Sequence, residues 1–242
     1  MIKEPACRYS PGRHRGKMRL VLFDIDGTLL LTNGAGTRAL NRAFLELFSL
    51  EEGMRNVRPD GKTDPLIVRE ALRVNGGLPD LDSGQLDEFF RCYERFFAQE
   101  MRSNGLQVFW GAFRLARLLA DDPRFRVGLA TGNIESCAWA KLQHAGIDGL
   151  FSFGAFGSDA ADRTEVIRTA IRRGADGRPE HVESAIVIGD TPLDVEHGHK
   201  AGARTIAVAT GNYSIRKLQS SRPGLAVETL QPSPELLAFL EL

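Results

Sequence analysis

The sequence has few cysteines, no excess of charge and no long apolar run, and each shortage excludes a class of protein. Its three cysteines, Cys7, Cys92 and Cys137, are far apart in the chain. They form neither a C-x-x-C pair nor an even disulfide set. We therefore expect reduced thiols in a cytoplasmic protein. No apolar run approaches the roughly 20 residues of a membrane-spanning helix, so we expect no membrane partner.

The charges balance, because 31 lysines and arginines are matched by 31 aspartates and glutamates. A chain without net charge does not attract nucleic acid or anionic lipid over its whole surface. We expect no nucleic-acid partner, and a charged ligand must be held by a local site. Residues 1–17 are basic but lack the apolar segment of a secretory signal. We expect a disordered arm there, or a gene start placed too early, with Met18 as the first native residue.

Short apolar runs alternate with amphipathic segments along most of the chain. Apolar runs bounded by turn residues are typical of strands that are covered on both faces of a parallel sheet. Alternation with helices of this length predicts an α/β fold, a Rossmann-like parallel sheet flanked by helices. The predicted strands are 19–25, 125–131, 150–156, 184–190 and 204–210, and the predicted helices are 111–122, 134–146, 163–175 and 192–203.

A long insertion separates the first predicted strand from the second. It contains amphipathic helical patterns at residues 36–53, 64–77 and 83–101. The insertion therefore predicts an α-helical cap. Its joints, TNGAG and SNG, contain glycine and could act as hinges, although ordinary turn formation explains them equally well. The predicted division is a cap over residues 33–105 and a core of residues 18–32 and 106–242.

Acidic and hydroxyl side chains follow the ends of three predicted strands. In an open parallel sheet, ligands bind outside the carboxyl ends of the strands, so these side chains should meet at one edge. Clustered carboxylates repel one another unless a cation lies among them, and a set of oxygen ligands suits Mg²⁺. The residues are Asp24 and Asp26 at the end of the first strand, Thr131, Gly132 and Asn133 at the end of the second, and Asp190 and Asp194 at the end of the fourth.

A lone aspartate at a strand end is more often a helix cap or turn former than a ligand. Asp64 precedes Pro65, which suits the first turn of a helix, so we interpret Asp64 as a helix N-cap. That interpretation weakens for Asp24 and Asp26, because they occur as a pair and Asp190 joins them from another strand. A carboxylate beside Mg²⁺ can attack phosphorus, and a second carboxyl two residues along can protonate the leaving oxygen and later activate water.

The motifs DIDGT, ATGN and GDTPLD occur in this order, at residues 24–28, 130–133 and 189–194. They resemble the motifs of the haloacid dehalogenase superfamily, specifically its phosphatase-like members with a helical cap inserted after the first strand. The resemblance covers the core, roughly residues 19–30 and 106–212, whereas the cap matches only in length and helical character. It implies a Mg²⁺-dependent hydrolase of phosphoric monoesters, similar to phosphoglycolate phosphatases, that acts on a small phosphorylated metabolite.

The resemblance also implies a role for each matching residue. Asp24 would be the nucleophile that forms an aspartyl-phosphate, and Asp26 would be the general acid and base. Mg²⁺ would bind Asp24, the backbone carbonyl of Asp26 and the carboxylate of Asp190, with Asp194 in support. Hydroxyl and backbone donors after the second strand would hold the phosphate. These donors belong to Thr131, Gly132 and Asn133.

The family usually places a lysine after its third strand, where it neutralises the phosphate and the nucleophile. Here no lysine lies between Lys141 and Lys200. Arg163, at the start of a predicted helix, is the best substitute because arginine can bind phosphate bidentately. The alternative for Arg163 is an ordinary surface arginine. In the cap, Lys62 could reach a substrate, or it could be a solvated turn lysine.

Two other functions stay open. A phosphomutase resembling β-phosphoglucomutase would keep both acids, and its cap would have to hold a sugar bisphosphate. A non-catalytic phosphate-binding or phospho-accepting regulatory protein could use Asp24 as an acceptor, but it has no obvious need for Asp26 or for a cap. Dehalogenation is disfavoured, because dehalogenases protonate no alkoxide leaving group and lack the second acid of the first motif.

Overall fold

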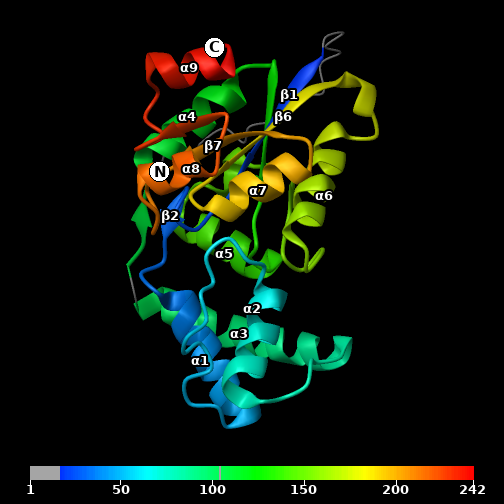
Figure 1. The fold of residues 1–242 in the computed structure, drawn as a ribbon, viewed down its shortest axis with the longest axis vertical. Helices are drawn as coiled ribbons and strands as arrows, with labels where there is room; N and C mark the ends of the chain where they lie inside the picture. The colour runs from blue at the N-terminus through cyan, green and yellow to red at the C-terminus, as the bar shows by residue number, and fades with distance from the viewer. Residues whose placement is uncertain (1–16, 104) are drawn as a thin grey trace, which may run out of the picture.

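The structure of the protein, a computed structural model, describes residues 17–103 and 105–242 (Figure 1). The disordered arm expected for residues 1–17 lies outside this part of the chain, apart from residue 17. Within the described ranges, no helix combines the length and the apolar character that crossing a membrane requires.

The described residues of the core form a six-stranded sheet in which every neighbouring pair is parallel. Strand β1 (Met18–Phe23) lies at the centre, between β4 (Phe125–Ala130) and β6 (Val182–Gly189). The order β5-β4-β1-β6-β7-β8 confirms the predicted parallel α/β fold. The outer strands are β5 (Gly154–Ala155), β7 (Arg204–Val208) and β8 (Leu225–Val227).

Helices cover both faces of the sheet. Alternate residues of β1 point to opposite faces, so Val21 and Phe23 join one apolar cluster while Leu20 and Leu22 join another. Because both faces are buried, the strand is a continuous apolar run in the sequence. One layer contains α4 (Trp110–Asp121), α5 (Glu135–Ala145) and α9 (Pro234–Leu240), and the other contains α6 (Arg163–Ala175), α7 (Pro192–Lys200) and α8 (Ile215–Ser220).

The strand register brings three functional segments to the same height. Phe23, the last residue of β1, pairs with Leu129 of β4 and with Ile188 of β6. The residues that follow these three therefore leave the sheet side by side. In Figure 1 this edge of the sheet faces the helices α1, α2 and α3.

Those helices form the cap. The two chain crossings between core and cap are tied by a short antiparallel ladder of β2 (Leu30–Leu31) and β3 (Gln107–Val108). Inside the cap, the rings of Phe44 and Phe89 lie 4.8 Å apart in an apolar cluster of its own. The cap helices are α1 (Ala35–Phe48), α2 (Asp64–Ala71) with a π-helical turn at Leu72–Gly76, and α3 (Ser83–Ser103).

Helix α5 lies between core and cap and contributes to both apolar clusters. Ala138 and Leu142 belong to the core cluster, whereas Ile134, just before the helix, and Cys137 belong to the cap cluster. The contact surface between the two parts is therefore partly apolar.

Two local predictions were wrong. Of the strand predicted at 150–156, only Gly154–Ala155 pairs. Phe151 and Phe156 are instead buried side chains of the core cluster, so packing rather than strand pairing explains that apolar run. The second error concerns Asp64, because the N-cap of α2 is Thr63 and the helix begins at Asp64.

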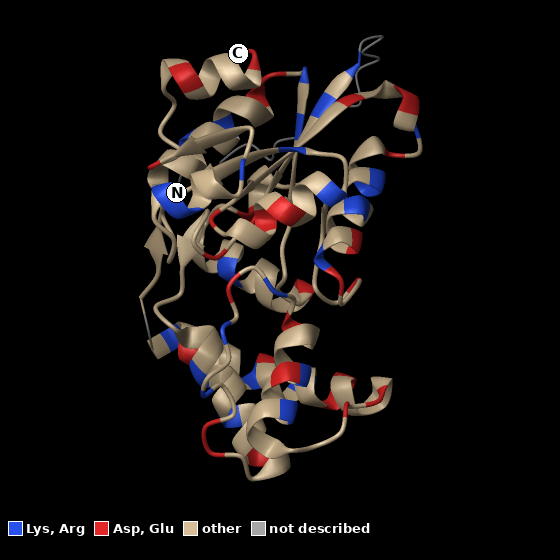
Figure 2. Ribbon diagram, viewed as in Figure 1, with Lys and Arg blue, Asp and Glu red and all other residues tan. Residues whose placement is uncertain are grey.

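Charged side chains of both signs are interspersed over core and cap in the view of Figure 2. Some form surface pairs, such as Arg173 with Asp159 at 2.7 Å. Exposed pairs of this kind each contribute little to stability. The charges that bear on chemistry are the buried ones at the edge of the sheet.

Candidate active site

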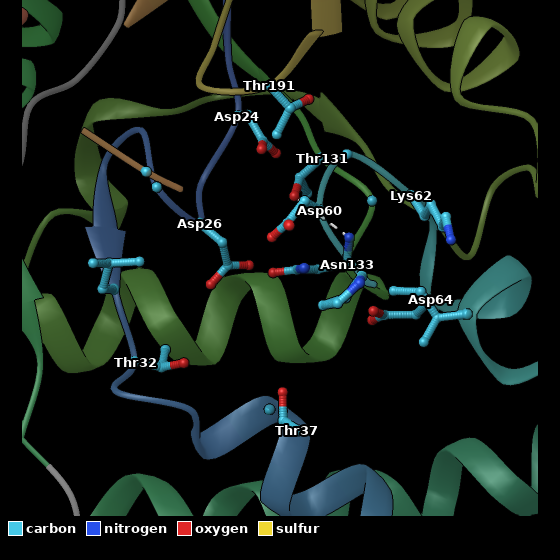
Figure 3. A pocket seen from close by; sticks show the side chains of 18 of the residues that line it. Asp24, Asp26, Thr32, Thr37, Asp60, Lys62, Asp64, Thr131, Asn133 and Thr191 are labelled. Atoms are coloured by element: carbon cyan, nitrogen blue, oxygen red, sulfur yellow. Dashed lines mark hydrogen bonds between the residues drawn. The ribbon is translucent and has the colours of Figure 1, made fainter. Parts of the chain in front are cut away.

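A cavity of about 370 Å³ lies between the carboxyl edge of the sheet and the cap. This volume suits a small ligand. Figure 3 shows Asp24, Asp26 and Thr131 grouped on the core side, with Thr32 and Thr37 facing them from the direction of α1. Of the residues predicted from the sequence, Asp194 lies outside the cavity lining. The lining includes Asp24, Asp26, Lys62, Thr131, Gly132, Asn133, Arg163 and Asp190.

Arg163 is buried and reaches the end of β1 from the first turn of α6. Its Nη2 atom lies 3.1 Å from Oδ1 of Asp24 and donates hydrogen bonds to Oδ1 of Asp194 and to the carbonyl of Ala130. Helix α6 begins here because the Asp162 carboxylate caps it. Burial raises the pKa of Asp24 to about 6, although Arg163 opposes this effect. The guanidinium therefore supplies positive charge beside the carboxylate predicted to be the nucleophile.

Asp190 has the features of a metal ligand. Its Oδ1 atom is buried and has no hydrogen-bond partner among the described residues. Burial raises the pKa of Asp190 to about 9, and the nearby Asp194 and Asp24 carboxylates contribute. Oxygens of these three carboxylates lie within 4.8 Å of one another. A divalent cation would offset the repulsion among the carboxylates and would give Oδ1 of Asp190 a partner, so the oxygen donors fit Mg²⁺.

Both carboxylate oxygens of Asp194 are already engaged. Oδ1 accepts the hydrogen bond from Arg163 at 2.9 Å. Oδ2 accepts from the backbone N–H and the hydroxyl of Thr191, which form a capping box at the start of α7. Asp194 therefore orients Arg163 and fixes the turn that carries Asp190, while Asp24 and Asp190 offer the side-chain oxygens for an ion.

Lys141 was not predicted as a site residue, yet it is a second buried cation of the cavity. Its Nζ atom donates to Oδ2 of Asp26 at 2.5 Å and to Oδ1 of Asn133 at 2.6 Å, and the residue is 3% exposed. Burial lowers the pKa of Lys141, but Asp26 and Asp64 raise it, and the net shift is upward. The available signal was its position one helical turn after Cys137 and Ala138, on the buried side of α5.

The start of α2 docks the cap onto the predicted phosphate loop. The backbone N–H of Asp64 donates to the carbonyl of Gly132 at 2.7 Å, and the Asp64 carboxylate accepts the N–H of Ile134 at 2.8 Å. Thr63 donates its hydroxyl proton to the carbonyl of Ala161. This explains the error about Asp64: its side chain caps α5 in the core rather than its own helix. The partner is remote in sequence, so a local pattern could not reveal it.

Residues 21–208 match the model of the haloacid dehalogenase-like hydrolase family. The chain belongs to this family. It is 25% identical over 224 residues to a phosphoglycolate phosphatase of Aquifex aeolicus, which covers 88% of this chain and 97% of the relative. It is 23% identical over 230 residues to a pyrophosphatase PpaX of Listeria monocytogenes, covering 93% and 97%. The resemblance inferred from the motifs is confirmed.

The fold agrees with solved members of the haloacid dehalogenase-like group. The crystal structure of CbbY from Rhodobacter sphaeroides in complex with phosphate superimposes with a TM-score of 0.68 at 21% identity. The match covers 93% of this chain and 100% of that one. The fold of this chain is therefore a known one over most of its length.

In this haloacid dehalogenase-like hydrolase, Lys62 lies at the margin of the cavity. Its ammonium pairs with Glu70 on α2, and Figure 3 shows the amino group directed away from Asp24. Its carbonyl oxygen instead contacts the predicted phosphate loop, because a Cβ atom on Gly132 would lie 2.0 Å from it. A substrate contact by the Lys62 side chain stays a prediction that requires the pair with Glu70 to open.

The close approach at Gly132 gives a testable prediction. A Gly132→Ala variant of the hydrolase must separate the cap segment from the core loop, since the added methyl would overlap the Lys62 carbonyl. Overpacking of this kind costs roughly 1–3 kcal/mol. We expect a lower melting temperature and a reduced kcat/KM. Gly149→Ala is the matched control, because its added Cβ meets nothing within 4 Å. Equal behaviour of the two variants would contradict the docking contact.

Asp64 gives a second prediction, on pH. Burial raises its pKa to about 6, against the opposing effects of Lys141 and the Ile134 N–H. The Asp64 carboxyl of the folded protein thus binds a proton more tightly than that of the unfolded chain. The free energy of unfolding of wild type therefore gains from Asp64 as the pH falls through about 6. At pH 8 we expect Asp64→Asn to be more stable than wild type, because the amide buries no charge. This difference in the free energy of unfolding should shrink by roughly 1 kcal/mol between pH 8 and pH 5. Urea unfolding measures it.

The control for this prediction is Asp60→Asn in the same cap segment. The Asp60 carboxylate accepts an exposed hydrogen bond from the side chain of Asn212 at 2.9 Å. A pH-independent difference between wild type and Asp64→Asn would contradict the burial of a charged Asp64.

Proposed function

We propose that this hydrolase is a Mg²⁺-dependent phosphatase of a small phosphorylated metabolite and acts through an aspartyl-phosphate on Asp24. One observation carries the proposal: Asp24 and Asp26 line the same cavity as Arg163 and Asp190, and Oδ1 of Asp190 has no hydrogen-bond partner within residues 17–103 and 105–242. Two acids, a buried arginine and a place for a cation are the groups that phosphoryl transfer to a carboxylate requires. The names of the relatives support the reaction class.

The proposed reaction has two steps. First, a carboxylate oxygen of Asp24 attacks phosphorus, and the bond from phosphorus to the leaving oxygen breaks while the carboxyl of Asp26 gives that oxygen a proton. Next, Asp26 accepts a proton from water, the water oxygen bonds to phosphorus, and the bond to Asp24 breaks. Inorganic phosphate leaves, and both side chains return to their starting states.

The surrounding residues hold the transferring group. Arg163 offers positive charge next to Asp24, and the Thr131 hydroxyl with the loop at Gly132 and Asn133 offers polar contacts at the end of β4. When bound by Asp24 and Asp190, Mg²⁺ supplies Lewis acidity that offsets the negative charge of the phosphate. The donors of residues 131–133 directly follow β4 at the sheet edge, and Arg163 is held by Asp194 and the Ala130 carbonyl, an arrangement that favours preorganised electrostatic stabilisation.

The size and lining of the cavity support a small substrate. About 370 Å³ must hold both the phosphate and the rest of the molecule. On the cap side the lining is a mixture of hydroxyl groups, from Thr32 and Thr37, and apolar side chains, from Leu40 and Ile67. We propose phosphoglycolate-like monoesters as the first substrates to test, with pyrophosphate beside them because relatives carry these names.

The test is Mg²⁺-dependent release of inorganic phosphate from p-nitrophenyl phosphate, phosphoglycolate, pyrophosphate and a series of sugar and alcohol monophosphates. We expect release from at least one compound, abolished by EDTA and restored by Mg²⁺. The absence of release by folded protein from the whole series would contradict the proposal. Phosphoryl transfer between positions of a sugar phosphate, dependent on its bisphosphate, would favour a phosphomutase. Labelling of Asp24 without turnover would favour a regulatory protein.

A further inference from the structure

Two buried cations of the cavity contact different acids. Arg163 pairs with Asp24, whereas Lys141 pairs with Asp26. The two aspartates have different parts in the proposed reaction, so the two cations are not duplicates. Arg163 is the proposed substitute for the lysine that the family places after its third strand. The motifs at residues 24–28, 130–133 and 189–194 include no residue of α5, and Lys141 has no part in the proposed two-step reaction.

The contacts of Lys141 are arranged around one oxygen of Asp26. The ammonium donates to Oδ2 of Asp26 and to Oδ1 of Asn133, and the ring centroid of Phe97 on α3 lies 5.6 Å away. Among the described residues, Oδ1 of Asp26 has no hydrogen-bond partner. The Asp26 side chain is 39% exposed where it lines the cavity, while that of Lys141 is 4% exposed. One carboxylate oxygen is thus anchored and the other is left for a ligand.

Simple packing does not explain a lysine at this position. Its neighbours one turn earlier on the same side of α5 are Cys137, in the cap cluster, and Ala138, in the core cluster. An apolar side chain could fill such a site without desolvating a charge, and burying an ammonium is costly unless a partner compensates it. The compensation here comes from a carboxylate that opens onto the cavity. Breaking the pair would free the Asp26 side chain to take other rotamers.

We propose that Lys141 is a positioning residue: it binds Oδ2 of Asp26 and holds the carboxyl group with its protonated Oδ1 directed at the leaving oxygen of the substrate. The inference rests on the proposed phosphatase function. It adds that the effect of losing Lys141 depends on the leaving group of the substrate. An alkyl phosphate leaves as an alkoxide and needs the proton from Asp26. p-Nitrophenolate is a stable anion and needs that proton far less. Loss of the Lys141 contact therefore slows alkyl phosphates selectively.

The experiment compares Lys141→Met, which keeps most of the length of the side chain without its charge, with wild type on p-nitrophenyl phosphate and on an alkyl phosphate. We expect kcat on the alkyl phosphate to fall on the order of 10²-fold, the usual contribution of general acid catalysis. The fall on p-nitrophenyl phosphate should be at least tenfold smaller, with KM little changed on both. Lys141→Arg keeps the charge and should recover most of the alkyl activity.

Two controls frame the result. Asp26→Asn should show the same selectivity for the leaving group. Lys62→Met removes a cation from the margin of the cavity that does not contact Asp26, and it should show no such selectivity. If Lys141→Met does not fold, Lys141→Gln carries the same comparison.

Each contrary outcome is distinct. Equal losses on both substrates by folded Lys141→Met would show a structural role and overturn the inference. A rise in KM at unchanged kcat would show that the lysine binds substrate directly, and it would overturn the inference as well. If wild type hydrolyses the substrates and either of these results is found, the proposed function is not contradicted. The absence of hydrolysis by wild type overturns the proposed function and this inference together.

Discussion

The Asp24→Asn variant is expected to fold like wild type and to lose turnover by on the order of 10⁴-fold or more, as when the nucleophile of a covalent mechanism is removed. The amide is nearly isosteric but cannot attack phosphorus. The fold should tolerate it, because burial already raises the pKa of Asp24 to about 6 and so disfavours the charge that the variant removes. Arg163 keeps its bonds to Asp194 and to the carbonyl of Ala130.

Rapid acid quench followed by mass spectrometry measures this prediction directly. Wild type should show a phosphoryl adduct on the peptide that contains Asp24 during turnover, and Asp24→Asn should show none. Asp26→Asn is the informative companion, because it keeps the proposed nucleophile and removes the proposed proton donor. Normal turnover by folded Asp24→Asn, or an adduct on a different residue, would contradict the assigned nucleophile.

The Asp190→Asn variant should show two opposite effects on stability. Without metal it should be more stable than wild type, because burial and the neighbouring Asp194 and Asp24 carboxylates raise the pKa of Asp190 to about 9 and the amide carries no charge. With Mg²⁺ the order should reverse, since wild type gains the binding free energy of the ion and the variant does not. The Mg²⁺ concentration for half-maximal activity should rise by on the order of 10²-fold.

Thermal unfolding with and without Mg²⁺ measures the crossover. Asp194→Asn is the control in the same turn, because the Asp194 carboxylate binds Arg163 and Thr191 rather than presenting a free oxygen. It should be less stable than wild type in both conditions and still respond to Mg²⁺. An equal Mg²⁺-dependent gain for wild type and Asp190→Asn would contradict the assignment of Asp190 as a ligand.

Much of the sheet was readable from the sequence, because strands buried on both faces are continuous apolar runs and their ends carry the acids. The pairing of Phe23 with Leu129 and Ile188 is what brings these ends together. Periodicity predicted α6 at its observed bounds, but it left a surface position open for Arg163, which the structure buries. The prediction failed at β5, where aromatic residues that pack into the core imitate a longer strand.

The parts of the site that the sequence did not show depend on contacts between remote segments. Lys141 meets Asp26 across 115 residues, and Asp64 meets Ile134 across 70. Neither contact has a local motif. A lysine in a helix is usually solvated, and an aspartate before a proline usually caps its own helix. The fold of the core brings Lys141 to Asp26, and the docking of the cap on the core brings Asp64 to Ile134.

Because α5 packs against both the core and the cap, it limits how chimeras of this protein with its homologues can be built. Ile134 and Cys137 complete the apolar interior of the cap, although they belong to the core segment of the chain. A chimera that exchanges only the residues between the two crossings would place a foreign cap on a surface shaped for the original one. Cap specificity should therefore transfer between homologues only when the outward side of α5 is transplanted with it.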